Sequence, residues 1–444
     1  MRSKTTISGV ILLFGLAGGC VGNRFAAPFP ASRPPAAQEG TAKNLSNPVE
    51  MDEPTGAVTL PQALAVALMK NPELAAFSWE RRAQDAATLQ AGLLPNPTLD
   101  LEMEDLGVST SPDTVPQRQH ALQLSQSIEM GGKRVKRRVA AALSRDLAGW
   151  DYDAQRIDLF TQVSHAFTDL LSAQGQQGLA EDGVRLAEEG ARVVSERVRA
   201  GKVSPIEETR ANVAVASAGI ERDRARNKRD AARKALAATW GSTIPRFDHA
   251  DGALGPPAPV PDLAQLTARL AQSPALARWT TEIAQRRAAV DLEQSLAVPD
   301  LTLTGGLRRY ESTEDHVFSL GLSLPLPLFD RNPGGIQAAR DRLAKGEAER
   351  RAAEVRVTTA LSDAYQALST ASIEATTLAE KVLPAATQVF EAVSEGYRLG
   401  KFGLLDVLDA QRTLRGAREQ HLNALADYRH AVAEVERLIG GALD

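Results

Sequence analysis

Alternating apolar and polar positions mark four segments of the chain as β-strands. The clearest is 316–328, where every second residue from Phe318 to Leu328 is large and apolar, with small, polar or proline residues between them. Weaker alternation predicts strands at about 98–105, 117–128 and 301–310. Each segment has roughly 8–12 residues, the length that a tilted membrane strand needs.

Longer stretches show the three-to-four-residue spacing of amphipathic helices. Residues 132–199 contain no proline, and this pattern predicts a helix of about 100 Å. Residues 335–398 form a similar segment, in which Pro384 predicts a kink or a local defect. Turns at 200–205 and 399–403 lead to return helices at 206–240 and 404–439. Each return helix covers about half of its partner, so the helix before the strands is expected to stack end to end on it.

The chain is an internal duplication. Landmarks recur at a shift of 202 residues and later of 199: Asn71-Pro72 as Ser273-Pro274, Gly132 as Gly334, Gly201-Lys202 as Gly400-Lys401, and Gly241 as Gly440. We therefore predict two similar repeats, 59–240 and 263–440, joined by a proline-rich linker at 241–262. The smaller later shift predicts that the second long helix is three residues shorter.

The expected fold class is mostly α with a small β part. An alternative places the strands as hairpins on a soluble core, but the chain offers little other apolar surface for them to cover. A lipid-facing band is favoured, and an open sheet edge in lipid is prohibitively costly. Because the smallest closed barrels have about eight strands, several copies of the chain must contribute strands to one barrel.

The N-terminus predicts export. Arg2 and Lys4 precede a short apolar stretch at 7–16, and small residues lead to Cys20, the only cysteine. The sequence around Cys20 resembles a bacterial lipobox, although the usual Leu lies one place farther upstream than in the commonest form. We predict a signal peptide at 1–19, lipid attachment at Cys20, and a lipid-anchored Pro/Ala-rich leader at 20–58. A plain signal peptide cut nearby is the alternative.

Composition excludes several classes of function. The net charge of -4 and pI of about 6.0 give no basic footprint for nucleic acid. The six histidines lack metal-ligand spacing, so no metal site is predicted. No phosphate loop or catalytic constellation is apparent, so we expect no enzyme activity and no cofactor. No later stretch of 18 consecutive apolar residues predicts a membrane-spanning helix.

The duplicated plan, the Gly-Lys turns and the run Asp406-Val407-Leu408-Asp409 together resemble the TolC-type outer-membrane efflux factors. Residues 325–335 and 91–97 resemble the heavy-metal branch, the cobalt–zinc–cadmium and copper–silver exporters. The resemblance implies a homotrimer with a 12-stranded barrel in the outer membrane and an α-barrel tunnel through the periplasm. It also implies a periplasmic adaptor (membrane fusion) protein, an inner-membrane RND pump and passive conduction of heavy-metal cations. Val21 and Gly22, in place of aspartate, point to the outer membrane.

The resemblance also assigns roles to residues. The turns at Gly201, Lys202, Gly400 and Lys401 would dock the adaptor, although Gly and Lys also suit any helix C-terminus. Glu207, Asp406 and Asp409 would line the periplasmic aperture, although acids also favour a first helical turn. Asp100, Glu102 and Glu104 would line the barrel lumen, where they could favour cations or only keep the surface hydrated. The family's closing arginine is replaced by Phe402.

A basic run at 133–138 could meet lipid headgroups or form a solvated face. The same fold could also serve drug efflux or type I protein secretion, and a periplasmic coiled-coil lipoprotein scaffold is the alternative from a different class. The strands separate the scaffold from the channel.

Overall fold

The computed structural model describes residues 53–104, 118–311 and 313–443. Cys20, most of the leader, and the expected strand ends at 105 and 117 lie outside the described residues. The first repeat comprises α1 (Leu60–Lys70), α2 (Pro72–Ala91), β2 (Thr98–Glu104), β3 (Gln119–Ile128), α3 (Lys133–Arg199) and α4 (Pro205–Ala238). The second comprises α5 (Leu263–Leu270), α6 (Pro274–Leu296), β5 (Leu301–Tyr310), β6 (His316–Ser323), α7 (Pro333–Thr377), a π-helical turn η1 (Leu378–Val382), α8 (Leu383–Arg398) and α9 (Leu404–Ile439).

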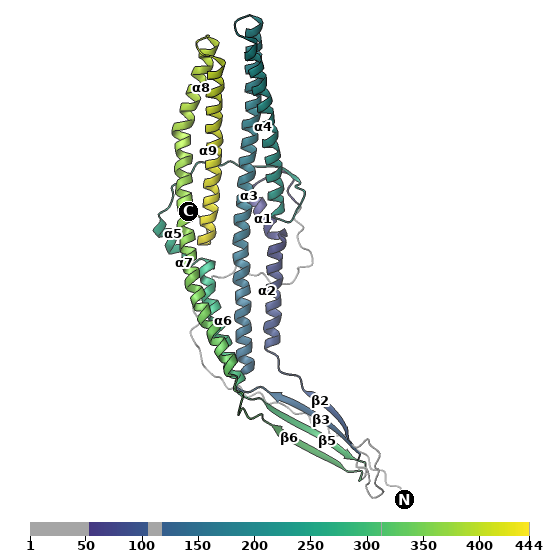
Figure 1. Ribbon diagram of the computed structural model, residues 1–444. Helices are drawn as coiled ribbons and strands as arrows, with labels where there is room; N and C mark the ends of the chain where they lie inside the picture. Colours follow the sequence, from purple (N-terminus) through teal and green to yellow (C-terminus); the bar gives the residue numbers. More distant parts are fainter. Residues whose placement is uncertain (1–52, 105–117, 312, 444) are drawn as a thin grey trace. The chain divides into compact units, whose positions relative to one another are not determined.

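The long helices carry the strands at one end and the hairpin turns at the other (Figure 1). Near the turns, the helices pack side by side in the order α4, α3, α9, α8, and near the strands α6 packs between α3 and α7. Each repeat has its own core beside the middle of its long helix. The first core joins α1, α3, the end of α4 and a short parallel strand pair, and the second joins α5, α7 and α9.

The expected end-to-end stacking is present in both repeats. The side-chain amide of Asn71, which caps α2, donates a 2.8 Å hydrogen bond to the carbonyl of Thr239 at the end of α4. Gly241 follows with φ +81°, and a Cβ there would lie 3.1 Å from Pro72. Gly440, with φ +73°, lies against Pro274 in the same way. Glycine is needed at both places because the backbone is left-handed and no room exists for a side chain.

The two hairpins join into one antiparallel sheet with the order β2-β3-β5-β6. Residues directly opposite one another share a face. The register aligns apolar residues in rows on one face: Leu99–Leu124–Gly305–Leu320, Leu101–Leu122–Leu307–Phe318, and Leu303–Leu322. These side chains are exposed, with Phe318 at 84% and Leu320 at 90%. The hairpins therefore do not cover a soluble core, and that alternative is wrong.

The strand expected at 316–328 ends early. Pairing of β6 stops at Ser323, because Pro325 and Pro327 have no N–H to donate to a ladder. The alternation nevertheless continues to Leu328, and Leu324, Leu326 and Leu328 remain exposed.

One prediction about the repeat is wrong, and one pair of sequence landmarks has different structural roles. Gly132 caps α3 in a left-handed conformation, but the residue that does so for α7 is Asn332, with φ 58°, and not Gly334. The continuous helix from Pro333 to Arg398 has segments of 45, 5 and 16 residues, against 67 in α3. It is thus one residue shorter and not three. The other two missing residues fall between the equivalent strand residues, Leu99 and Leu301, and the helix caps. Most of the loss is therefore in the hairpin.

The linker and the leader also contain structure that the sequence patterns did not predict. β1 (Gly56–Val58) pairs in parallel with β4 (Phe247–Ala250). Val58 and Phe247 are fully buried against the first core. This pair joins the start of the first repeat to the segment after its end.

The defect expected at Pro384 is present as the π turn η1. The N–H of Leu383 donates to the carbonyl of Leu378, five residues earlier. Proline cannot donate to the helical ladder, and the extra residue of a π turn accommodates the break without ending the helix. The corresponding stretch of α3 is uninterrupted.

The repeats also meet along α3 and α9. The rings of His165 and His430 lie with centroids 4.7 Å apart, and His430 Nε2 lies 3.1 Å from the Asp169 carboxylate. The contact with Asp169 raises the pKa of His430, whereas burial lowers the pKa of His165. A proton taken up by this pair therefore goes first to His430.

Candidate functional site

Both hairpins end in the same tight turn. Gly201 and Gly400 are left-handed, with φ +65° and +75°. The N–H of Lys202 donates to the carbonyl of Arg197 at 2.9 Å, and that of Lys401 to the carbonyl of Gly396 at 2.7 Å. These are the long hydrogen bonds of Schellman motifs. Both lysines are exposed, so each turn presents one cation to the surroundings.

The two turns are held together by a contact that the sequence patterns did not predict. The Arg197 guanidinium lies 4.5 Å from the centroid of the Tyr397 ring and donates to the Tyr397 carbonyl at 3.1 Å. Below them, a small apolar cluster contains Val194, Ala211, Tyr397 and Leu404. Because Arg197 belongs to the first repeat and Tyr397 to the second, this cluster links the two hairpins next to their turns.

Phe402, which replaces the family's closing arginine, does not reach across to the other hairpin. Its ring lies against Gly396, where a Cβ would overlap it. By the shift of 199 residues, Gly396 corresponds to Arg197 of the first repeat. Glycine in α8 thus makes room for Phe402, while the arginine of α3 supplies the contact between hairpins.

The three acids expected at an aperture all lie near the starts of the helices that follow these tips. The Asp406 carboxylate accepts a 2.8 Å hydrogen bond from the N–H of Gly403, so it caps α9. Asp409 is exposed one turn later, and Glu207 is half-buried in the first turn of α4. Capping thus accounts for Asp406, whereas nothing in the fold of one chain requires Asp409 to be acidic.

Asp100, Glu102 and Glu104 lie on the polar face of the sheet, opposite the leucine rows. The same face carries Gln123, Ser125 and Arg308. Arg308 donates a 3.0 Å hydrogen bond to the side chain of Gln119. The acids are concentrated on β2, at the edge of the sheet, and Arg308 lies two strands away on β5.

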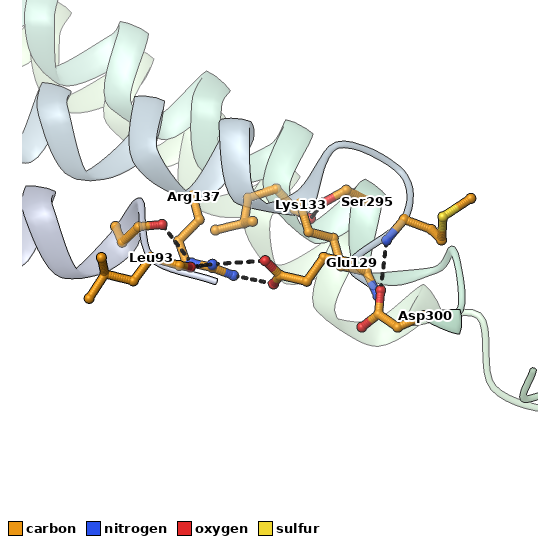
Figure 2. Close-up of polar contacts among 9 residues, drawn as sticks. Leu93, Glu129, Lys133, Arg137, Ser295 and Asp300 are labelled. Atoms are coloured by element: carbon orange, nitrogen blue, oxygen red, sulfur yellow. Dashed lines mark hydrogen bonds and ion pairs between the residues drawn. The ribbon is translucent and has the colours of Figure 1, made fainter. Parts of the chain in front are cut away.

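The junction between β3 and α3 contains a buried ion pair (Figure 2). Lys133 Nζ lies 2.7 Å from Asp300 Oδ1, and the Lys133 side chain is only 8% exposed. The same carboxylate oxygen accepts a 2.9 Å hydrogen bond from the N–H of Met130. Burial acts to raise the pKa of Asp300, but the hydrogen bonds from Lys133 and Met130 lower it overall.

Arg137 fastens a third chain segment to the same junction (Figure 2). Its guanidinium binds both carboxylate oxygens of Glu129, at 2.6 and 3.1 Å. It also donates to the carbonyl of Ala91, the last residue of α2, and to that of Leu93 just beyond it. Of the five cations in the basic run, Lys133 and Arg137 are therefore engaged inside the protein and do not meet lipid headgroups.

The equivalent junction in the second repeat is built differently. Asn332 donates its side-chain amide to both the backbone and the carboxylate of Glu293, at 3.0 and 2.6 Å. The connection from β6 to α7 is also longer than the one from β3 to α3, which consists of 129–132. The duplication has therefore kept the plan of strand followed by helix but not the contacts that fix it.

Among the described residues, no cluster of three or more His, Cys, Asp or Glu side chains is arranged to hold a metal ion. In the same part of the chain, every helix is too short or too polar to cross a membrane.

The geometry defines a class of protein. Paired long-helix hairpins end in an exposed two-sided sheet that is apolar on one side, and this architecture is that of the outer-membrane channel-tunnels. The chain belongs to the outer membrane efflux protein family, which matches residues 63–242 and 266–441. The expectation of a TolC-type efflux factor that is not an enzyme, located in the outer membrane, is confirmed.

Known relatives support the same family assignment. Cobalt-zinc-cadmium resistance protein CzcC of Cupriavidus metallidurans is 37% identical over 406 residues, covering 91% of this chain and 95% of CzcC. Nickel and cobalt resistance protein CnrC of the same organism is 28% identical over 73% of this chain and 77% of its own length. Among solved structures, CusC has a TM-score of 0.74 at 16% identity, covering 87% of this chain and 94% of its own. The CmeC channel of Campylobacter jejuni also has a TM-score of 0.74, at 17% identity, over 94% and 95%. The expected fold class is confirmed.

Proposed function

We propose that this chain forms the outer-membrane duct of a tripartite efflux system that exports divalent heavy-metal cations. The observation that carries the choice of cargo is the 37% identity over nearly the full length of a cobalt-zinc-cadmium resistance protein. The duct itself needs no metal site, because a passive channel conducts without selective binding and the pump selects the cargo.

Three copies of the chain would close the duct. The outer helices α4 and α8 each pack against one long neighbouring helix of the chain and leave apolar positions exposed. On α4 these are Ile206, Val213 and Ile220, spaced by seven residues and 54–61% exposed; on the other edge they include Val382 and Val389. A seven-residue spacing forms a seam against another helix. The sheet edges β2 and β6 also need partners in lipid, and three chains supply the twelve strands of a closed barrel.

The partners follow from the same orientation. With the sheet in the outer membrane, the hairpin turns point into the periplasm, where an adaptor would contact Gly201, Lys202, Gly400 and Lys401. Beyond the adaptor, an inner-membrane RND pump would load the duct. Cys20 would carry a lipid anchor in the outer membrane, which would hold the leader close to the barrel.

A deletion strain tests the cargo. Loss of the gene should lower resistance to Co²⁺, Zn²⁺ and Cd²⁺, and the full-length chain should restore it, while minimal inhibitory concentrations of organic drugs stay unchanged. Loss of drug resistance without a metal phenotype would instead support export of organic compounds. One relative favours this second candidate: Pyoverdine export outer membrane protein OpmQ of Pseudomonas aeruginosa is 25% identical over 87% of this chain.

The aperture acids have their own test. The variant Asp406→Asn with Asp409→Asn should lower the cation-over-anion permeability ratio several-fold in planar bilayers, because rings of carboxylates around a constriction attract cations. Asparagine keeps the capping acceptor for the N–H of Gly403, so helix α9 should remain intact. Asp427→Asn, an exposed acid far along the same helix, is the matched control. Equal selectivity in the double variant and the wild type would remove these acids from the aperture.

A further inference from the structure

The outermost complete row of the apolar sheet face contains an arginine and two histidines instead of leucines. The register aligns Met103, His120, Arg309 and His316 across all four strands. This row follows the Leu101–Leu122–Leu307–Phe318 row on the same face, because residues two apart on a strand point to the same side. It lies toward the strand ends that are farthest from the helices (Figure 1).

The position of the row matches the end of a lipid-facing band. Arg309 lies eight residues beyond Leu301, about 26 Å along the strand at 3.3 Å per residue, which is about 20 Å of height for a strand tilted by about 40°. On the helix side, exposed leucines continue along the β6 segment to Leu328. An outward apolar band is about 25 Å tall in outer-membrane barrels. The Arg309 row therefore lies where hydrocarbon gives way to headgroups.

Charge in the row is only partly neutralised by the protein. The Glu311 carboxylate lies 3.0 Å from His120 Nε2 and 4.0 Å from Arg118. Arg309 and His316 are exposed, and neither makes an ion pair or a side-chain hydrogen bond within the described part of the chain. The Glu311 carboxylate also attracts Arg309, but from beyond ion-pair distance, so Arg309 is an exposed guanidinium on a lipid-facing surface with no directly paired carboxylate among the described residues.

We propose that this row binds the phosphate groups of a phosphorylated glycolipid in the outer leaflet of the membrane. The orientation rests on the proposed function, in which the strand ends far from the helices face the cell exterior. A guanidinium binds phosphate oxygens bidentately, and the contact is stronger beside hydrocarbon than in water. The imidazoles of His120 and His316, on either side of Arg309, supply further donors. A neutral headgroup would leave Arg309 without a directly bound counter-charge at the edge of the apolar band.

The neighbouring residue provides a matched control. Arg308 is on the same strand but points to the polar face, where it is hydrogen-bonded to Gln119. Substitution of either arginine by glutamine removes one positive charge, and the two positions are adjacent on the same strand. Only Arg309 can reach a lipid on the apolar face.

The test uses the full-length protein in detergent and measures lipid binding by native mass spectrometry. Three lipids are compared: a bis-phosphorylated lipid A, the same lipid after phosphatase treatment, and phosphatidylglycerol. We expect lipid A to bind at least tenfold more tightly than either of the others. Arg309→Gln should weaken lipid A binding about tenfold, the size expected for one charge-assisted contact, while Arg308→Gln should not change it.

Three results would overturn the proposal: equal binding of the dephosphorylated lipid, equal binding of phosphatidylglycerol, or equal loss in the two arginine variants. The first two use wild-type protein, so they hold even if a variant fails to fold. Single-channel conductance is recorded in parallel. If the protein conducts ions but binds lipid A equally well with and without phosphate, only this inference is wrong. If the protein forms no pore, the proposed function is wrong.

Discussion

Replacing Leu320 by Arg is expected to abolish insertion of the protein into lipid bilayers. Leu320 lies in a central row of the apolar face and is 90% exposed. An arginine near the middle of the bilayer costs a transmembrane barrel about 2–4 kcal/mol, and each copy of the chain in a closed barrel would carry that cost. The measurement is refolding into lipid vesicles, followed by carbonate extraction and by protease protection of the strands.

The control for this substitution is Ser319→Arg. Ser319 precedes Leu320 on β6, is paired with Gly306, and points to the polar face. An added arginine there would lie in the water-filled lumen, so insertion should be close to that of the wild type. The assignment of the faces would be wrong if the two variants inserted equally well, or if Ser319→Arg were the more damaging.

Replacing Asp300 by Asn is expected to destabilise the folded protein by about 3 kcal/mol, the lower end of the range for breaking a buried ion pair. The lower end applies because the Asp300 side chain is 33% exposed and solvent screens part of the pair. The asparagine oxygen can still accept the hydrogen bonds from the N–H of Met130 and from Lys133, so the loss comes from leaving the buried Lys133 without a counter-charge. Urea denaturation of the refolded protein, followed by tryptophan fluorescence, measures the change.

Glu129→Gln is the comparison for that experiment. It also breaks an ion pair at the junction, but Arg137 keeps its hydrogen bonds to the carbonyls of Ala91 and Leu93. Its cost should therefore be smaller, on the order of 1 kcal/mol. If Glu129→Gln were as costly as Asp300→Asn, burial of Lys133 would not be what makes the pair important.

The pH dependence of the Asp300 contribution has a definite sign. Its pKa in the folded protein is below the ordinary value of 3.8. The contribution is therefore complete above the pKa of the unfolded chain and is lost as the pH falls through the lower folded-state pKa. As the pH falls below about 4, the free energy of unfolding of the wild type should therefore decrease more than that of Asp300→Asn.

Most of the fold could be predicted from local patterns. The alternation in 316–328 identifies both the strand and the face that meets lipid, because side chains on a strand have a period of two residues. The absence of proline from 132–199 identifies the longest helix, and the repeated Gly-Lys pairs identify both turns. Where the predictions were wrong, two local rules competed. The leucines of the 324–328 segment favour a strand, but the prolines between them remove the hydrogen-bond donors.

The candidate site was less predictable. The acids Asp406 and Asp409 can be found from the sequence because they lie next to a recognisable turn. Asp300 and Arg197 could not be found, because their partners are 167 and 200 residues away. Both belong to contacts between the repeats, and a duplicated sequence does not reveal which positions have acquired contacts that the other copy lacks.

The sequence by itself determined the long helices, the four strands of the larger sheet, their order, the apolar side of that sheet and the duplicated plan. Each of these depends on residues close together in the chain, through hydrogen-bonding periods and turn geometry. Tertiary structure alone decided how the repeats are joined: Lys133 with Asp300 at the strands, His165 with His430 in the middle, and Arg197 with Tyr397 at the tips. Those contacts depend on which helix faces meet, and packing of the two repeats against each other sets that register.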